Sequence, residues 1–242
     1  MSDMLFLKKT TSSKLLFLKI SVSLQNQTND KQNKVMVTSE NTLANSPNGH
    51  EAIDLGLPSG TKWASCNLGA TTPEAYGCYF AWGETTEKET FDWATYIHCD
   101  GSNDTCHDLG ESISGTEYDV ANMKWGGNWQ MPTLEQLEEL IENCDYEWMT
   151  REGVEGGLLT SKINGNSIFF PAAGIYYGPR LGYRGEFGHY WLGTQDWNDS
   201  FCAFSLRFYR NYAGWNYNDN RNEGLSVRPV WNDEEEEREE EE

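Results

Sequence analysis

The division of the chain into short apolar runs separated by glycines constrains its fold more than any other feature. In the last third of the chain, one such run covers Ser167–Phe170 and another covers Phe204–Arg210. In the second run, apolar residues at positions 204, 206 and 208 alternate with Ser205, Arg207 and Tyr209. Because successive strand side chains point to opposite faces, this alternation predicts a half-buried strand. The spacing of the runs predicts several short strands.

One segment has the pattern of a helix. Thr133 and Gln136 match a capping box, in which each side chain bonds the backbone N–H of the other residue. Apolar residues then recur at helical spacing, at Leu134, Leu137, Leu140 and Ile141. This spacing places them on one face, and the helix is predicted to end near Asn143.

The remaining segments indicate strands and loops. Residues Ile53–Ala64 alternate about Pro58–Gly60 and predict a hairpin, whereas residues 85–120 are long, polar and irregular. One firm helix, many short strands and long loops together predict an α+β fold.

Composition divides the chain into three parts. Residues 1–51 are predicted to be a disordered segment or a leader and linker, 52–230 one binding domain, and 231–242 a disordered acidic tail carrying nine acids and Arg238. The apolar run Leu15–Leu18 follows three lysines as in an export signal, but Lys19 interrupts it and no small-residue cleavage site follows. Export or surface display and a plain polar linker both stay open.

Charge and hydropathy exclude two classes of partner. No apolar run approaches the roughly 20 residues of a membrane span, so no transmembrane span is expected. The formal net charge of -20 argues against nucleic acid, which requires a cationic face. The sequence leaves the oligomeric state open.

The catalytic and metal-binding patterns of the sequence are incomplete or have simpler interpretations. No nucleophile elbow, Walker loop or dinucleotide fingerprint is present, so no enzymatic activity and no cofactor are expected. His98-Cys99 and Cys106-His107 offer four zinc-type ligands, but their spacing favours a local disulfide or free thiols. Trp197-Asn198-Asp199, preceded by Asp196, offers oxygen ligands for calcium, against the alternative of a polar loop anchored by Trp197.

Residues 176–222 have the composition of a binding surface. Tyrosine gives contact area at low entropic cost, and asparagine, serine and arginine give adaptable or directed hydrogen bonds. Loops on a rigid scaffold are where binding usually resides. The predicted ligand-binding residues are Tyr176, Tyr177, Arg180, Tyr183, Arg184, His189, Asp196, Asn198, Asp199, Ser200, Arg207, Tyr209, Arg210, Asn211, Tyr212, Asn216, Tyr217, Asn218, Asp219, Asn220, Arg221 and Asn222.

Several motifs, in order along the chain, carry a resemblance to a known family. They are Asp54–Ala64, Asn67–Ala70, Tyr79–Glu84, Trp125–Thr133, Phe170–Gly174 and Ser226–Val230. Over about residues 52–230 the chain resembles the Fibrobacter succinogenes major paralogous domain, common in Bacteroidetes. That family is similar to the formylglycine-generating-enzyme-like branch of the C-type lectin fold.

The resemblance implies a C-type-lectin-like domain with short twisted strands, and a protein that is exported or at the cell surface. The same fold carries the variable proteins of diversity-generating retroelements, whose diversified positions near the C-terminus are rich in Asn, Asp, Tyr, Ser and Arg. Residues 176–222 resemble such a repertoire, with a fixed loop of similar composition as the alternative. We therefore expect a non-enzymatic adhesin or receptor-like module that binds a protein or glycan on another surface.

Two other functions follow from the same resemblance. A calcium-dependent carbohydrate-binding lectin is the first alternative, although the companion Glu-Pro-Asn or Gln-Pro-Asp loop is absent. An oxidase-like enzyme of the formylglycine-generating fold is the second. That reaction requires a pair of late cysteines, and only Cys202 lies in the last ninety residues.

Overall fold

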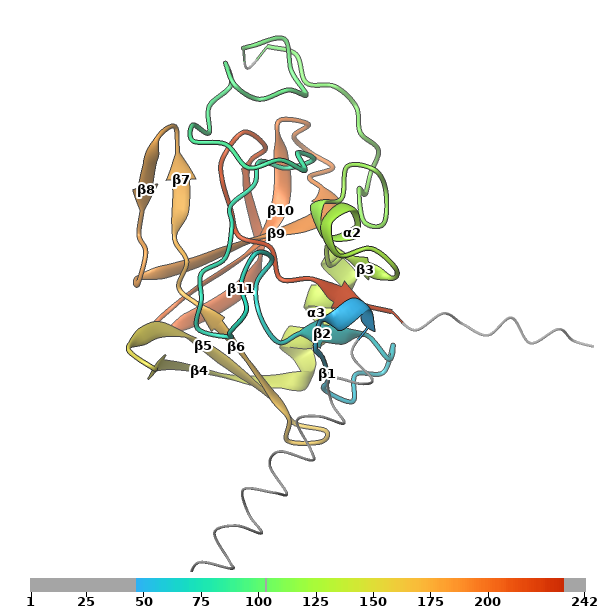
Figure 1. The fold of residues 1–242 in the computed structure, drawn as a ribbon, viewed down its shortest axis with the longest axis vertical. Helices are drawn as coiled ribbons and strands as arrows, with labels where there is room; N and C mark the ends of the chain where they lie inside the picture. The colour runs from blue at the N-terminus through green and yellow to red at the C-terminus, as the bar shows by residue number, and fades with distance from the viewer. Residues whose placement is uncertain (1–46, 103, 233–242) are drawn as a thin grey trace, which may run out of the picture. The chain divides into compact units, whose positions relative to one another are not determined.

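The computed structural model describes residues 47–102 and 104–232, which contain twelve strands and two α-helices (Figure 1). The predictions made for residues 1–46 and 233–242 lie outside the described residues. The described part begins with a 3-10 turn, Pro47–Gly49, followed by His50, whose ring stacks on Trp125 with centroids 3.7 Å apart. Packing contacts therefore begin just before the predicted boundary at residue 52.

Four sheets make up most of the described structure. The first has the order β1 (Ala52–Asp54), β2 (Lys62–Ala64), β12 (Val230–Trp231) and β3 (Trp129–Gln130). The second contains β4 (Cys144–Arg151), β5 (Val154–Ser161) and β6 (Ser167–Pro171). The third is the hairpin β7 (Ile175–Tyr177) and β8 (Arg180–Gly182). The fourth has the order β11 (Tyr212–Asn220), β10 (Cys202–Tyr209) and β9 (Phe187–Gln195). This strand-rich arrangement with few helices is consistent with the predicted α+β class.

The first sheet joins the two ends of the domain. The predicted hairpin is confirmed, because β1 and β2 pair antiparallel with Ile53 opposite Trp63. Val230 of β12 then pairs with Trp63 from the other side of β2. Trp63 of β2 and Val230 of β12 are both buried in the same hydrophobic core, so this core holds the N-terminal hairpin and the last strand together.

The predicted helix is confirmed as α3 (Leu134–Asn143), including both hydrogen bonds of its capping box. A short helix α2 (Val120–Trp125), which was not predicted from the sequence, precedes it. The buried carboxylate of Asp119 caps α2 by accepting from the N–H groups of Ala121 and Asn122. The same carboxylate also accepts from the backbone N–H groups of Gly115 and Met131. It therefore connects the irregular loop to the residue that directly follows β3.

The sheet β9–β10–β11 separates two hydrophobic cores. As predicted, Phe204, Leu206 and Phe208 share one face, and all three are buried in the larger core. On the opposite face, Trp191 and Ala203 pack in the smaller core with other apolar residues that include Leu225 and Val227. The smaller core covers only part of this second face, and the uncovered part carries a candidate site.

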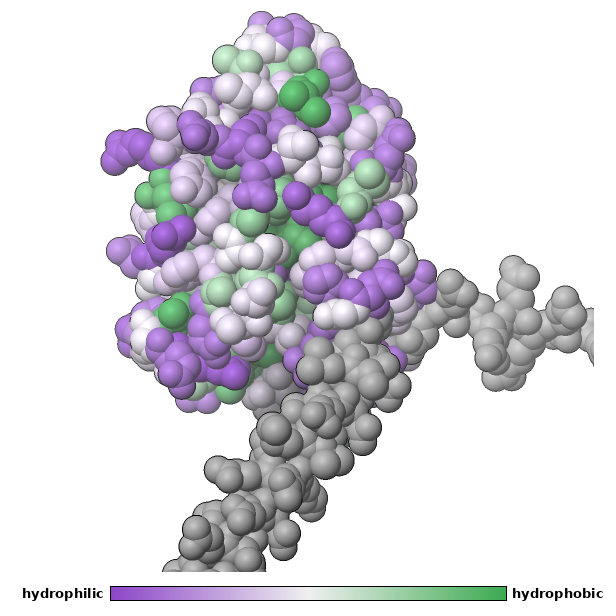
Figure 2. Space-filling model, in the orientation of Figure 1, coloured by the Kyte–Doolittle hydropathy of each residue, from purple (hydrophilic) through white to green (hydrophobic). Residues whose placement is uncertain are grey.

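The segment between β2 and α2 is irregular over residues 85–119, as predicted, and Phe91 and Tyr96 anchor it by their burial. Figure 1 shows its outermost part at the end of the domain farthest from β4. On the side seen in Figure 2, hydrophilic and intermediate residues dominate, and hydrophobic residues appear as small separate patches. No helix in the described part of the chain has the length and apolar character needed to cross a membrane.

Candidate functional site

The predicted surface 176–222 separates into two sites and a remainder. The first, the aromatic face, lies on the uncovered part of the sheet β9–β10–β11 and beside hairpin β7–β8. Its members are Tyr177, Tyr183, Phe187, His189, Arg207, Tyr209, Tyr212 and Tyr217, with Asp219 beneath them. The second, the loop cavity, lies between the loop that contains Cys106–Ser112 and the segment that follows β9.

Strand register assembles the aromatic face. Arg207 of β10 lies opposite His189 of β9, and Tyr209 lies between Phe187 of β9 and Tyr212 of β11. Since residues at alternate strand positions share a face, all of these side chains are on the same side of the sheet.

The aromatic face contains a small cavity. Tyr177, Tyr183, Phe187, His189 and Arg207 line a hollow of about 250 Å³. Tyr177 and Tyr183 are exposed, and the Tyr183 ring makes an edge contact with Phe187 at 5.4 Å between centroids. The hollow therefore has aromatic walls and a cationic side chain.

Asp219 holds the polar groups of this face in place. Its carboxylate accepts hydrogen bonds from the Ser205 hydroxyl at 2.6 Å and from Arg207 Nη2 at 3.0 Å, and it lies 3.3 Å from His189 Nδ1. Burial alone would raise the pKa of this carboxyl. Its hydrogen bonds and the neighbouring positive charge instead hold the pKa below its usual value, with His189 the largest contributor. The carboxylate is thus ionised, and it orients the Arg207 guanidinium, whose Cζ lies 4.4 Å from the centre of the Tyr217 ring.

A second carboxyl near this site behaves differently. Glu223 is buried, and its pKa is raised to about 7. Burial is the main cause of this rise, and the negative charge of Asp219 contributes to it. Hydrogen bonds from the backbone and side chain of Asn220 oppose the shift. Glu223 therefore changes charge near neutral pH, whereas Asp219 does not.

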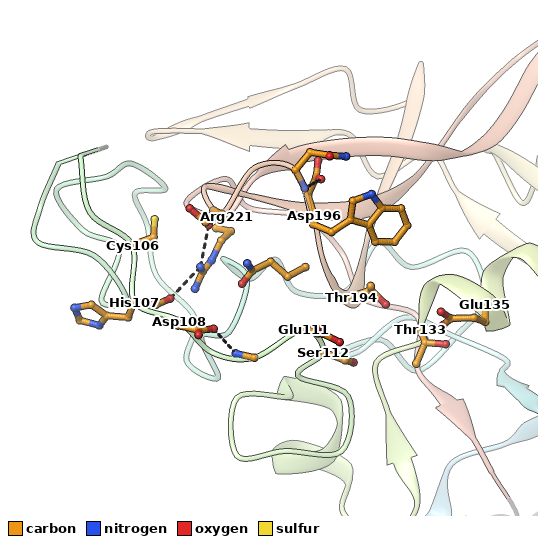
Figure 3. A pocket seen from close by; sticks show the side chains of 15 residues that line it. Cys106, His107, Asp108, Glu111, Ser112, Thr133, Glu135, Thr194, Asp196 and Arg221 are labelled. Atoms are coloured by element: carbon orange, nitrogen blue, oxygen red, sulfur yellow. Dashed lines mark hydrogen bonds between the residues drawn. The ribbon is translucent and has the colours of Figure 1, made fainter.

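The loop cavity is larger, with a volume of about 900 Å³ (Figure 3). Three elements form its walls: the loop Cys106–Ser112, the beginning of α3 at Thr133 and Glu135, and the segment Thr194–Ser200. Arg221, which follows β11, completes the lining. These segments are far apart in sequence, so the cavity exists only in the folded chain.

Arg221 is fully buried beside this cavity. Its Nε donates to the Tyr96 hydroxyl at 2.9 Å, and its Nη1 donates to the carbonyls of His107 and Ser200 at 3.1 and 3.0 Å. Its guanidinium packs over the Trp82 ring at 4.6 Å. Nη2 is buried without a hydrogen-bond partner, and Arg221 forms no ion pair among the described residues. Figure 3 shows the side chain extending from its strand end toward His107.

The structure gives no cation site at the positions considered from the sequence. The Asp196 carboxylate accepts from the backbone of Asn198 and the side chain of Asn218, and Asp199 accepts from the backbone of Phe201. The thiol of Cys99 is free and donates to backbone carbonyls rather than bonding Cys106. Within residues 47–102 and 104–232, no group of three or more His, Cys, Asp and Glu side chains is arranged to hold a metal ion.

Several predicted surface residues are buried, and for them the prediction of an outward position was wrong. These are His189, Asp196, Asp219, Arg221 and Asn222. Each makes hydrogen bonds inside the protein. His189 pairs with Asp219, which also accepts from Ser205 and Arg207. Asp196 and Asn222 bond backbone or amide groups, and Arg221 donates to two carbonyls and the Tyr96 hydroxyl. Trp197, predicted to be a loop anchor, is instead 70% exposed, although its ring contacts Phe204 at 4.6 Å.

The remaining predicted residues lie outside the two sites or at their edges. Tyr176 is half-buried against Tyr79 and Phe91, and Arg184 packs over the Tyr76 ring. Arg210 lies 3.8 Å from Glu155. Asn198 and Ser200 line the loop cavity. Arg184 and Arg210 are exposed and lie in neither site, as do Arg180, Asp199, Asn211, Asn218 and Asn220. The side chain of Asn216 is not among the described ones.

Sequence reasoning missed three parts of these sites. Phe187 belongs to the aromatic face. It lies two positions before His189 in the same strand, and this spacing, which places both side chains on one face, could have identified it. Glu223 carries no local signal, since its pKa depends on burial. The loop residues Asp108–Ser112 and the start of α3 also join the cavity without any shared sequence motif.

Comparison of the chain with known protein families, with curated proteins and with solved structures gives no match. The geometry of the two sites therefore carries the functional argument.

Proposed function

We propose that this domain is a non-enzymatic binding module, of adhesin or receptor type, and that its aromatic face contacts a protein or glycan on another surface. The observation that carries the proposal is the gathering of tyrosines around an arginine whose orientation is set from below by Asp219. Tyrosine and arginine are the residue types enriched at binding hot spots.

Rigidity supports this proposal. Tyr212 stacks on Tyr209 with centroids 5.5 Å apart, and Arg207 is held by both Asp219 and the Tyr217 ring. Side chains already fixed in the free protein lose little conformational entropy when a ligand binds. The face therefore resembles a pre-organised paratope on a sheet scaffold.

We propose further that the domain has the C-type-lectin-like fold of the Fibrobacter succinogenes major paralogous domain family. Two features support this assignment. Met131-Pro132-Thr133 leads directly into α3, and the segment Ser226–Val230 closes the domain beside β2. Diversification of residues 176–222 by a retroelement belongs to the same proposal, and the neighbouring DNA would test it through a template repeat and a reverse transcriptase.

Binding assays on an array of glycans and surface proteins would test the aromatic face. We expect Tyr177→Ala with Tyr183→Ala, and separately Tyr212→Ala with Tyr217→Ala, to abolish the hits of the unchanged protein. Met123→Ala and Ile163→Ala are matched controls, because both side chains are exposed and lie outside the face. Equal binding by both double variants would remove the aromatic face from the site.

The assay also separates the alternatives if it is repeated with calcium and with a chelator. Binding that requires calcium and is lost on Asp196→Asn or Asp199→Asn would support the lectin alternative. Stoichiometric copper in the purified protein would support the oxidase alternative.

A further inference from the structure

Two of the six cysteines, Cys99 and Cys106, lie directly opposite each other in a short antiparallel bridge. Both thiols are free, and both residues are half-buried. Cys144 and Cys202 lie in strands, but each is opposite a residue that carries no thiol. Within the part of the chain that the structure describes, this bridge is the place where β pairing brings two thiols together.

The bridge places the two cysteines at the closer kind of cross-strand position. The N–H of His107 donates to the carbonyl of His98 at 2.8 Å, and the N–H of Asp100 donates to the carbonyl of Thr105 at 3.4 Å. These hydrogen bonds flank the cysteines rather than join them. In such a non-hydrogen-bonded pair the Cα atoms are about 4.5 Å apart. A disulfide spans Cα separations of about 4.4–6.8 Å, so the backbone need not move for the bond to form.

The present contacts of the two thiols oppose the bond only weakly. The Cys99 thiol donates to the carbonyls of Trp93 and Tyr96 at 3.2 and 3.3 Å, and S–H is a weak donor. Cys106 lines the loop cavity (Figure 3) and is not fully buried, so a small disulfide reagent has access from the cavity. Burial raises the pKa of the Cys106 thiol, and the reaction, which requires a thiolate, is therefore faster at alkaline than at neutral pH.

The two sides of the bridge are anchored differently. On the Cys99 side, Tyr96 is buried and its hydroxyl donates to the carbonyl of Trp82 at 2.8 Å. On the Cys106 side, residues 107–108 and 110–112 are exposed and form one wall of the loop cavity. A covalent bond between the two cysteines would tie this exposed wall to the anchored side.

We propose that Cys99 and Cys106 are an oxidisable pair, and that a small disulfide of the oxidised glutathione type converts them into a cross-strand disulfide that fixes this wall of the loop cavity. The proposal is independent of ligand binding by the aromatic face.

The reaction consists of two exchange steps. The thiolate of one cysteine attacks the S–S bond of the oxidant, forms a mixed disulfide and releases one thiolate. The thiolate of the other cysteine then attacks the protein sulfur of the mixed disulfide and releases the second half of the oxidant. The two protons lost by the cysteines pass to the released thiolates. The cysteine pair loses two electrons, and the oxidant is reduced to two thiols.

Thiol counting on the full chain tests the pair. The reduced protein is incubated with excess oxidised glutathione, the remaining thiols are alkylated in denaturant, and the intact mass gives the number of labelled cysteines. We expect this number to fall by two from the six of the sequence, with a link between Cys99 and Cys106 in the non-reduced digest. An unchanged count, a link between other cysteines, or glutathione adducts in place of the link would overturn the proposal.

Serine variants assign the link. Cys99→Ser and Cys106→Ser should each abolish it and leave the remaining cysteine as an adduct with glutathione. Cys202→Ser is the matched control, because Cys202 is also free and half-buried, and this variant should form the link as the unchanged protein does. A count that still falls by two in Cys99→Ser, with no glutathione adduct, would contradict the assignment.

Hydrogen exchange tests the effect on the cavity wall. In the oxidised protein we expect the amide of His107 to exchange at least tenfold more slowly than in the reduced protein. The closed loop is short, so the melting temperature should rise by only a few degrees. Unchanged exchange at His107 would show that the link does not fix the wall. Tyr212→Ala with Tyr217→Ala should form the link at the same rate, which keeps this test separate from that of the aromatic face.

Discussion

The aromatic face and the loop cavity each contain an arginine, and the protein treats the two arginines in opposite ways. Arg207 lies over the Tyr217 ring and is paired with Asp219 at 3.0 Å. Arg221 lies over the Trp82 ring and forms no ion pair among the described residues. Both guanidiniums stack on a ring, but of the two only Arg207 pairs with a carboxylate within the described part of the chain.

The difference separates two ways of preparing a surface. On the aromatic face, Asp219 compensates the charge internally, so the arginine and its neighbouring rings are fixed before any ligand arrives. Beside the loop cavity, no described residue supplies a counter-charge, and two carbonyls, the Tyr96 hydroxyl and the Trp82 ring hold the guanidinium of Arg221 instead.

The largest contrast is expected between the two fully buried arginines. Arg228→Met leaves Asn67 Oδ1 and the carbonyls of Ala64 and Phe169 without donors in the core, and we expect a loss of about 4 kcal/mol in unfolding free energy. Arg221→Met should cost only about 1–2 kcal/mol, because the carbonyls of His107 and Ser200 belong to cavity-lining residues where water can replace the donor. Urea denaturation measures both. An equal loss in the two variants would identify Arg221 as a structural residue.

The next effect concerns the compensation of Arg207. Asp219→Asn removes a buried negative charge and leaves Arg207 and His189 without it, so we expect a loss of about 3 kcal/mol in unfolding free energy. Asp145→Asn is the matched control, since that carboxylate is 80% exposed and lies 3.8 Å from Lys162. The control should change stability by less than about 0.5 kcal/mol. Similar losses in both variants would show that the Asp219 network contributes no more than a surface ion pair.

A third prediction uses the pH dependence of Glu223. Its pKa in the folded protein, about 7, is above its usual 4.5, so the folded state holds this proton more tightly than the unfolded state. The group therefore stabilises the fold fully below about pH 4.5, and this contribution, about 3 kcal/mol, is lost as the pH rises through 7. Glu223→Gln should remove this loss and make the protein more stable than the unchanged chain at pH 8. Parallel stability profiles for the two proteins from pH 5 to 8 would contradict the assignment.

The smallest effect is expected for Trp197. Its exposed side chain contacts Phe204, and an aromatic pair contributes about 0.5–1.5 kcal/mol. Trp197→Ala should therefore lower the melting temperature by only a few degrees. A much larger drop, measured by thermal denaturation followed by circular dichroism, would show that the Trp197 ring contributes to the core rather than to the surface.

The elements that could be predicted from the sequence are those whose signals are local. The capping box of Thr133 and Gln136 and the alternation at Phe204, Leu206 and Phe208 both appear in the structure as expected. Helix α2 was missed because six residues contain too little periodicity, although Asp119 and Gly126 mark its two ends.

The composition of residues 176–222 predicted an exposed surface, and only part of this stretch is exposed in the structure. The same stretch of tyrosines, asparagines and charged residues contains the exposed Tyr183 and Tyr212 and the buried Asp219 and Arg221. A polar residue type favours exposure on average, but a carboxylate with three internal partners can be buried without penalty. The sequence does not show where those partners lie.

Helix capping and strand alternation depend on residues only a few positions apart, so the local elements can be derived from the sequence alone. The sequence also shows that tyrosine, asparagine and acidic residues are abundant, so the surface of the domain is rich in these types. The tertiary structure alone decided that Asp219 lies beneath Arg207, and that Arg221 meets a loop more than a hundred residues earlier with one nitrogen unpaired. Such contacts depend on strand register and loop closure, and these are set by the packing of the whole domain.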